Sequence, residues 1–264
     1  MSALWASGRY ELLMQLRKRS LWITTGVLLV LLGLVSRSGI IRIAEQPDAR
    51  TAMVATGQLL LELLPIGFGC LVADRLVRDD ILGVRPLLDA TPAGPAARLG
   101  GKYLGACAAA GLPIVGLYLL IAAVYAVGHA DPAAVGWALA VSAVTILPAL
   151  LFVGAFALVC PLLMPATLFR VLFVGYWFWS TVVGPRLMPT LTDTLLSPTN
   201  HYPVAVFLGY HDQFPYFTGP VPGATLNALR PPASPLTAAL AVAVLLGAAA
   251  LTLAAARARL ARNR

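Results

Sequence analysis

The sequence predicts an all-α, polytopic membrane protein with six transmembrane helices, and three observations support this fold class. Hydrophobic residues make up 59% and charged residues only 11% of the 264 residues, which is far from the composition of a soluble domain. Six apolar stretches approach or exceed the roughly 20 residues that a helix needs to cross a bilayer. Lysine and arginine are unevenly divided among the intervening loops. We expect one transmembrane domain over residues 1–264.

The six expected spans are separated by loops of very different lengths. The first and fifth spans are the shortest, and each needs flanking residues to complete a crossing. Because no small-residue cleavage site follows the first span, we expect it to be retained and not removed as a signal peptide. The spans comprise residues 21–35, 51–73, 103–128, 135–160, 168–183 and 235–256.

The basic residues predict how these spans are oriented. If the N-terminus is cytoplasmic, only five of the 19 lysine and arginine residues fall in outer segments. The positive-inside rule therefore predicts that both termini are cytoplasmic. Arginine outnumbers lysine 17 to 2, which is typical of a GC-rich bacterial genome and suggests a bacterial inner (plasma) membrane. The net charge of +8 is explained by orientation and lipid contact, and no soluble basic module indicates nucleic-acid binding. The five outer residues are Arg37, Arg42, Arg50, Arg186 and Arg230.

A short helix is expected before the first span. Residues 3–19 contain no proline, and their apolar residues recur at helical spacing. We expect an amphipathic helix lying along the cytoplasmic leaflet; the alternative is a short basic flank that only obeys the positive-inside rule. The apolar residues are Trp5, Leu12, Leu13 and Leu16, and the polar ones elsewhere on the wheel are Glu11, Gln15 and Lys18.

Two connections are too long to be simple linkers. The cytoplasmic elbow, residues 74–102, is dense in charge, and its first half is expected to continue the second span as a helix through Leu76 and Val77 until Gly83 and Pro86. The outer segment, residues 184–234, contains nine prolines. Proline at this density excludes long helices, but residues 202–210 can form a short helix that dips into the outer leaflet.

Motifs for hydrolytic chemistry are absent from the sequence. No G-x-x-x-x-G-K-[ST], H-E-x-x-H or G-x-S-x-G occurs, so the chain is not expected to be an enzyme or to bind a nucleotide or metal itself. His201, His211 and Asp212 in the outer segment could bind a metal, but solvated loop histidines explain them better. The three cysteines lie in or at the ends of expected spans, where they serve as small packing residues.

One carboxylate lies in the middle of a span. Glu62 must face a cavity or a partner, or remain protonated, because an ionised carboxylate is costly at that depth. Gln58 precedes it by one turn on the same face, and Pro65 follows and can free a backbone carbonyl. An ionisable group at this depth indicates a functional role, and a structural hydrogen bond at a helix or dimer interface explains Glu62 nearly as well.

The fifth span carries an aromatic stripe. Phe169, Phe173, Tyr176 and Ser180 lie on one face, where they could line a path for apolar or aromatic cargo, while Trp177 and Phe178 are expected to point elsewhere. Packing against lipid or protein is the alternative. In the third span, glycines 101 and 105 have the G-x-x-x-G spacing of a tight helix contact.

Two stretches resemble those of a known family. The elbow, ADRLVRDDILGVRPLLDATPAGPAARLGGKYLG from Ala73, is similar to the acidic-basic helix, Leu-Leu, Thr-Pro and Gly-Lys-Tyr of permease subunits of bacterial ABC transporters of the type-2 exporter family. The stretch RYELLMQLRKRSLWI from Arg9 is similar to the amphipathic helix with which these subunits begin. The chain therefore resembles this family over nearly its whole length.

The resemblance implies an all-α half-transporter that pairs with a second permease, identical or homologous, and with cytoplasmic ATPase subunits that bind ATP and Mg²⁺. It implies that the elbow contacts the ATPase, that short re-entrant helices form the outer segment, and that the second and fifth spans line a path at the dimer interface. The residues assigned to that path are Gln58, Glu62, Phe173, Tyr176 and Ser180. The residues assigned to coupling are Arg78, Asp79, Asp80, Arg85 and Asp89.

The function expected from the sequence is that of an exporter permease for a hydrophobic or amphipathic cargo such as a drug, a peptide or a lipid-like molecule. A secondary transporter or channel is an alternative, but it should show inverted repeats or more buried charges. A membrane anchor or sensor that transports nothing is another. The identity of the cargo and the choice between a homodimer and a heterodimer cannot be read from the residues.

Overall fold

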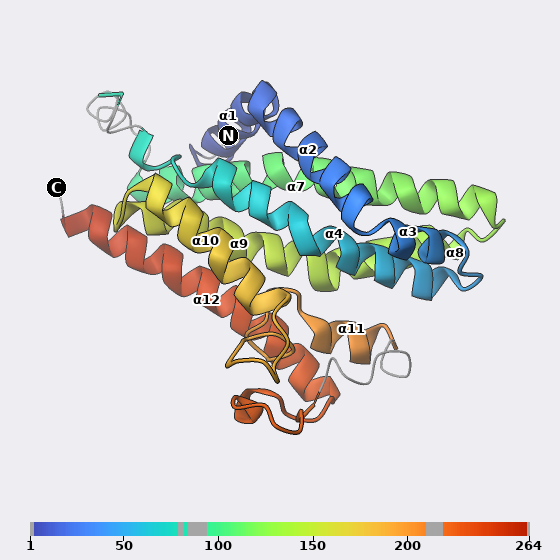
Figure 1. The fold of residues 1–264 in the computed structure, drawn as a ribbon. Coiled ribbons are helices and arrows are strands. Elements are labelled where there is room, and N and C mark those ends of the chain that lie inside the picture. Colours follow the sequence, from blue (N-terminus) through green and yellow to red (C-terminus); the bar gives the residue numbers. More distant parts are fainter. Residues whose placement is uncertain (1–2, 79–81, 84–93, 210–218, 263–264) are drawn as a thin grey trace.

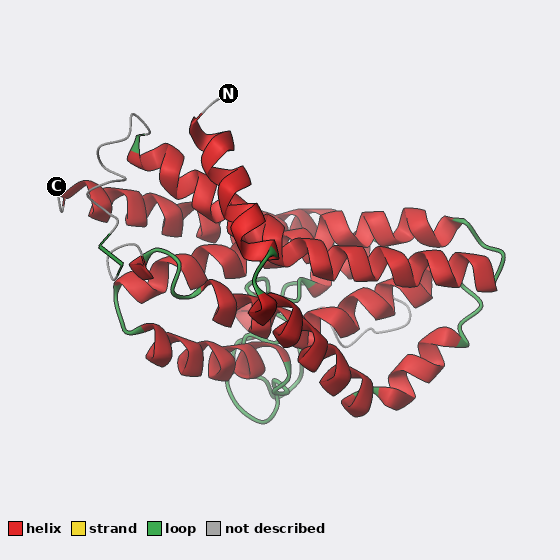
Figure 2. Cartoon of the chain, turned by 90° about the horizontal axis from the view of Figure 1, so that it is seen from above, coloured by secondary structure: helices red, strands yellow, loops and turns green. Residues whose placement is uncertain are grey.

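A computed structural model describes residues 3–78, 82–83, 94–209 and 219–262, and all regular structure in these residues is helical (Figures 1 and 2). A π-helical turn, η1 (Ser142–Ile146), and two 3-10 turns, η2 (Cys160–Leu162) and η4 (Asn227–Leu229), interrupt or connect the helices. The α-helices are α1 (Ala3–Leu16), α2 (Arg19–Val35), α3 (Arg37–Ala44), α4 (Ala49–Val72), α7 (Pro95–Gly128), α8 (Ala133–Val141), α9 (Leu147–Val159), α10 (Ala166–Thr181), α11 (His201–Phe207) and α12 (Pro235–Arg262).

Four helical segments of the described chain are long and apolar enough to cross a membrane. They are Ala49–Val72, Ala96–Gly128, Ala133–Leu162 and Pro235–Arg259. Helices α1 and α2, which meet at a bend of 62°, make a fifth span if they are counted together. The structure thus indicates a multi-pass membrane protein. Helices α2 and α10, at 17 and 16 residues, are shorter than a full crossing, so the expectation of six complete spans is met only in part.

Helix α4 is the centre of the bundle. It contacts α2, α3, α7, α8, α9 and α10 (Figure 1). Its glycines make these contacts close, because a Cβ atom at Gly57 would lie 2.6 Å from Cγ1 of Val141, and one at Gly69 would overlap the ring of Phe173. The end of α4, the beginning of α7 and both chain termini lie toward the same end of the bundle (Figure 1).

Helix α1 lies against the first turns of α7. The expected tight contact at glycines 101 and 105 is confirmed: a Cβ at Gly101 would lie 2.6 Å from Cβ of Ser7, and one at Gly105 would lie 2.5 Å from the carbonyl oxygen of Gly8. The helix itself is found where the sequence predicts it. Its buried side chains, however, are the polar Glu11 and Gln15. The face of α1 that approaches α7 closely is the one that carries Ser7 and Gly8, and Glu11 and Gln15 lie on the same face.

The apolar residues of α1 consequently point outward. Trp5 is 62% exposed and Leu13 is 43% exposed, and Leu12 and Leu16 are partly buried. Outward-facing tryptophan and leucine beside arginine are typical of a helix that contacts the boundary between lipid tails and headgroups. Taken over its whole length, however, α1 has apolar residues on all sides, so the prediction of one apolar face was wrong.

A proline explains the π-helical turn between α8 and α9. Pro148 has no N–H to donate to the carbonyl of Val144, four residues earlier, and its ring would crowd that carbonyl in a regular helix. The chain widens by one residue, and Leu147 N–H donates to Ser142 O, five residues back. The carbonyl of Val144 instead accepts from the side-chain amide of Asn200 at 3.1 Å. The outer segment is thereby joined to the middle of a helical span.

The elbow begins differently from the prediction. Helix α4 ends at Val72, and residues 73–76 form a turn before helical hydrogen bonds resume from Arg78 N to Asp74 O. The first half of the elbow was expected to continue α4 as a helix: its helical hydrogen bonds, which include Leu82 N to Arg78 O, agree with this, but the turn at residues 73–76 breaks the continuity. The turn carries the side chain of Arg75 inward, where it contacts polar groups of α1. Most of the elbow lies outside the described residues.

Candidate functional site

Helices α4 and α10 lie side by side and form the candidate path. The aromatic ring of Phe173 packs against Gly69, and the indole nitrogen of Trp177 donates a hydrogen bond to the backbone oxygen of Glu62 at 2.8 Å. Near one end of the pair, Arg170 Nε donates to Cys70 O at 3.0 Å. The prediction that the expected second and fifth spans are neighbours is confirmed.

The predicted path residues are divided between the surface and the interior. Phe173 and Ser180 are buried, Gln58 and Tyr176 are partly buried, and Glu62 is exposed. The amide nitrogen of Gln58 is buried and has no hydrogen-bond partner among the described residues. Glu62 and α10 therefore share one side of the bundle, with the carboxylate at its surface.

Trp177 was predicted to point away from this interface, and that prediction was wrong. Its side chain is fully buried, with 0% exposure, and it forms a ladder with Phe173 and Phe169, whose ring centroids are 6.0 Å and 5.5 Å apart in successive pairs. The i, i+4, i+8 spacing of these three residues was visible in the sequence. The buried indole N–H needed an acceptor, and the backbone of α4 near Pro65 supplies one.

The carboxylate of Glu62 lies near the middle of α4, at position 14 of 24. Among the described residues it forms no hydrogen bond or salt bridge. The imidazole of His201 is close enough to interact with it electrostatically. His201 belongs to α11 in the outer segment, which packs against α12 and the π-helical turn η1.

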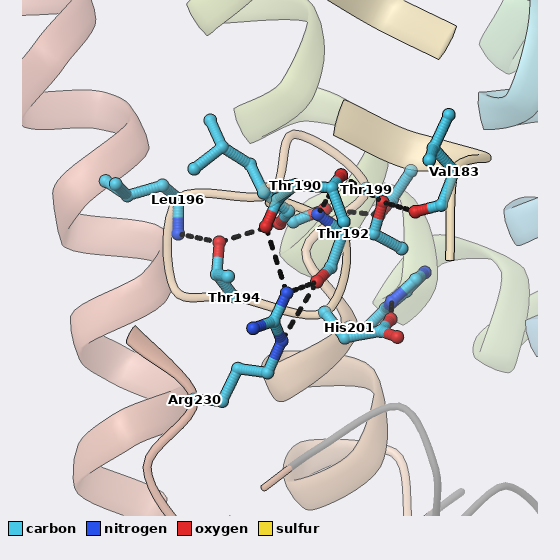
Figure 3. Close-up of polar contacts among 11 residues, drawn as sticks. Val183, Thr190, Thr192, Thr194, Leu196, Thr199, His201 and Arg230 are labelled. Atoms are coloured by element: carbon cyan, nitrogen blue, oxygen red, sulfur yellow. Dashed lines mark hydrogen bonds and ion pairs between the residues drawn. The ribbon is translucent and has the colours of Figure 1, made fainter. Parts of the chain in front are cut away.

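The outer segment is organised around a buried arginine (Figure 3). Arg230 is 1% exposed, and its guanidinium donates to the backbone oxygens of Thr190 and Thr192 at distances from 2.9 to 3.2 Å. Burial lowers the pKa of Arg230 from its ordinary value, while the nearby Asp193 acts in the opposite direction. A guanidinium remains charged nonetheless, so this loop contains a permanent buried cation held by carbonyl oxygens.

Threonine hydroxyls complete the same loop and connect it to the end of α10. The hydroxyl of Thr192 donates to Val183 O at 2.8 Å, and that of Thr190 donates to Trp179 O. The indole of Trp179 donates in turn to Pro189 O at 2.8 Å. These bonds satisfy carbonyls at the end of α10 that no longer have helical partners. The expected short helix of the outer segment is confirmed as α11, His201–Phe207.

His201 has a partner within the outer segment. Its Nδ1 lies 2.7 Å from Oδ1 of Asp193 (Figure 3). The described residues contain no group of three histidine, cysteine or carboxylate side chains suited to a metal, and His211 and Asp212 of the alternative metal site lie outside them. The three cysteines, including Cys107 and Cys160, are free thiols.

A polar cluster joins α1 to the end of α4. Arg75 donates to Gln15 Oε1 at 2.5 Å, Gln15 donates to Glu11 Oε1 at 2.7 Å, and Arg75 Nη1 lies 3.7 Å from Glu11 Oε1. Burial lowers the pKa of Lys18, and the positive charges of Arg75 and Arg78 lower it further. Nothing in the sequence distinguishes the buried Arg75 from Arg78, three residues later, whose side chain is exposed.

The coupling residues can be placed only at their beginning. Arg78 is exposed next to the turn that ends α4, whereas Asp79, Asp80, Arg85 and Asp89 lie outside the described residues. Close by, Asp74 and Arg170 form an exposed salt bridge of 3.9 Å between the elbow and α10. The elbow is thus in direct contact with the helix that carries the aromatic ladder.

No protein-family model matches the chain, and no curated protein matches it. The chemistry of the site must therefore be argued from its own residues. A carboxylate, an aromatic ladder and a partly buried amide are groups that can bind a ligand.

Proposed function

We propose that this chain is the transmembrane permease subunit of an ATP-driven ABC exporter. It would work with a cytoplasmic ATPase subunit that binds ATP and Mg²⁺ and with a second permease, identical or homologous. It would move a hydrophobic or amphipathic cargo outward across a bacterial inner membrane in which both termini are cytoplasmic. The sequence resemblance at the elbow and the N-terminal helix motivates this proposal, and one structural observation supports it most.

That observation is the exposed carboxylate of Glu62 beside α10. A mid-span carboxylate facing hydrocarbon costs about 3 kcal/mol or more on biological insertion scales. The cost disappears if this face meets water or a second polar surface, as it does along a path between two permeases. A single chain in lipid would leave the face exposed, so the observation favours an assembly over an isolated membrane anchor.

The contacts at the end of α4 support coupling to a partner. Asp74 bonds to Arg170 of α10, and Arg75 bonds to α1, so a force applied at the elbow reaches both helices directly. The chain has no phosphate-binding loop of its own, and the proposal assigns nucleotide hydrolysis to the partner. The exposed Arg78 and the acidic residues that follow it would form the docking surface.

Purification of the tagged chain from native membranes tests this proposal. The expected result is co-purification of an ATPase subunit with vanadate-sensitive ATP hydrolysis. Reversing the charges of the elbow with Arg78→Glu and Asp80→Arg should uncouple hydrolysis from transport without loss of folding. Arg257→Glu is the matched control, since Arg257 is exposed on α12, whose last residues lie toward the same end of the bundle. Transport by the purified chain without any ATPase would overturn the proposal.

A further inference from the structure

The inference concerns the charge of the cargo and rests on the function proposed above. Cationic side chains on α4 and α10 lie near the ends of these helices. Arg50 is near the beginning of α4, where its Cζ atom lies 6.0 Å from the centroid of the Trp137 ring. Arg170 of α10 pairs with Asp74, which lies just beyond the end of α4. At 1.5 Å per residue, Glu62 is about 18 Å along the helix from both Arg50 and Asp74. No described arginine or lysine of these two helices is therefore in reach of its carboxylate.

Pairing of two permeases would not supply the missing cation. In a two-fold dimer the same surface of each subunit meets at the interface. The face that carries Glu62 would then meet a second face with the same carboxylate, and an identical partner would add negative charge to the path. His201, the charged or titratable group of α11 within electrostatic range, already bonds to Asp193 at 2.7 Å.

Aromatic side chains provide the other half of a binding surface. Tyr176 is partly buried beside the face that meets α4, and its ring centroid is 6.2 Å from that of Trp179. Rings of this kind bind apolar groups and attract organic cations through their π faces. A carboxylate combined with aromatic rings in a region of low dielectric favours ligands that are both positively charged and apolar.

We propose that the α4–α10 face binds lipophilic organic cations, with the positive charge next to the Glu62 carboxylate and the apolar body against the aromatic residues of α10. The carboxylate selects the charge, since a bound cation stabilises its ionised form whereas an anion of equal size would oppose it. The rings select size and apolarity. The cargo of the exporter would accordingly be a cationic amphiphile, and neutral lipids or acidic peptides would be excluded.

Two probe ions of the same shape and opposite charge test this selectivity. Binding of tritiated tetraphenylphosphonium and of tetraphenylborate is measured by equilibrium dialysis on the chain in nanodiscs, with empty nanodiscs subtracted. We expect saturable binding of the phosphonium at least tenfold tighter than that of the borate. Equal affinity for the two ions, or no saturable phosphonium binding, would overturn the inference.

Variants assign the charge selectivity to Glu62. Glu62→Gln should weaken phosphonium binding about tenfold and leave borate binding unchanged or tighter, whereas Glu62→Asp should retain most of the preference. Glu45→Gln is the control, because Glu45 is an exposed carboxylate at the end of α3, outside the path. If Glu62→Gln fails to fold, the ratio between the two ions in the wild-type chain and in Glu62→Asp still decides. An unchanged ratio in a folded Glu62→Gln chain would contradict the assignment.

The assay contains neither ATP nor an ATPase, so it separates the two proposals. If cation-selective binding depends on Glu62 but the chain never associates with an ATPase, the cation-site proposal stands and the exporter proposal is wrong. If the chain forms a complex with an ATPase but binds both ions equally, the exporter proposal stands and the cation-site proposal is wrong.

Discussion

Two arginines are buried in the part of the chain that the structure describes, and their charges are compensated in different ways. Arg75, 6% exposed at the end of α4, lies against the carboxylate of Glu11 and the amide of Gln15 on α1. Arg230, 1% exposed before α12, donates to the backbone oxygens of Thr190 and Thr192, and it forms no salt bridge among the described residues. One site is an ion pair, and the other is a set of oriented carbonyl dipoles.

The difference shows what each region requires of its arginine. An ion pair needs a positive charge near a carboxylate, and it joins two helices that are far apart in sequence. A carbonyl cradle needs the planar fork of the guanidinium, because two neighbouring acceptors must be reached at once. The first site therefore depends on charge and the second on shape. Substitutions that change one property at a time can separate these requirements.

The largest effect is expected for Arg75→Met. Removing the guanidinium leaves the carboxylate of Glu11 buried without its counter-charge, and breaking a buried pair in this way costs about 3–5 kcal/mol. The free energy of unfolding is measured by titrating the purified protein with denaturing detergent. Adding Glu11→Gln to Arg75→Met should restore more than half of the loss. Wild-type stability of the single variant would show that the pair contributes no stability.

A smaller effect that separates charge from shape is expected for Arg230→Lys. Lysine keeps the positive charge but cannot reach both carbonyls as the fork does, so at least one buried acceptor loses its donor, at about 1–3 kcal/mol. Arg75→Lys is the comparison, and there the loss should be smaller because a point charge can still face Glu11. Equal losses in the two lysine variants would contradict the distinction between the two sites.

Gly105→Ala tests how tightly the ion-pair region is packed. The new Cβ would lie 2.5 Å from the carbonyl oxygen of Gly8 and 2.7 Å from Cβ of Glu11, and overpacking of this kind costs about 1–3 kcal/mol. Gly116→Ala on the same helix is the control, because no atom lies within 4 Å of its new Cβ, and alanine should raise stability slightly there. The measurement is the thermal unfolding midpoint of each variant. A lower midpoint in both would show that α7 does not tolerate alanine at either position, and that the loss is not specific to the contact with α1.

The smallest effect is expected for Asp48, whose carboxylate forms hydrogen bonds at the start of α4 and no salt bridge among the described residues. Its carboxylate accepts from Thr51 N at 2.9 Å and from Thr51 Oγ1 at 2.5 Å, capping α4. These hydrogen bonds lower the pKa of Asp48 in the folded state. Its contribution is therefore complete above the unfolded pKa of about 3.9 and is lost as the pH falls through the lower folded value.

Asp48→Ala should cost about 1 kcal/mol near neutral pH and should remove this part of the acid sensitivity. The measurement is the unfolding midpoint between pH 6 and pH 3 for the wild type and the variant. Parallel curves for the two proteins would show that the cap does not titrate with folding.

The sequence predicted features that depend on neighbouring residues. Helix α11 and the close contact at Gly101 and Gly105 follow from proline content and residue spacing, whereas the proximity of the second and fifth spans was implied by the family resemblance. Features that depend on a distant partner were missed. Arg75 and Arg230 look like other loop arginines, and only the fold shows which carboxylate or carbonyl they reach. For the same reason Glu11 and Gln15 were taken for the solvent-facing side of α1.

The path was predicted in part for a similar reason. Glu62 was singled out because its depth in a span is a property of the local sequence. Which side chains of α10 face it depends on how that helix is rotated about its own axis. The rotation is set by Gly69, which admits Phe173, and by the backbone acceptor for Trp177. Neither constraint is visible in the periodicity of α10.

The hydrogen bond from Asn200 to Val144 has a consequence for how the chain can evolve. The carbonyl of Val144 is open to Asn200 because Pro148 cannot donate to it. An amide-bearing residue at position 200 is therefore useful when proline occupies position 148, and a helix-forming residue at 148 would compete for the same acceptor. In related chains these two positions, 52 residues apart, should change together and seldom alone.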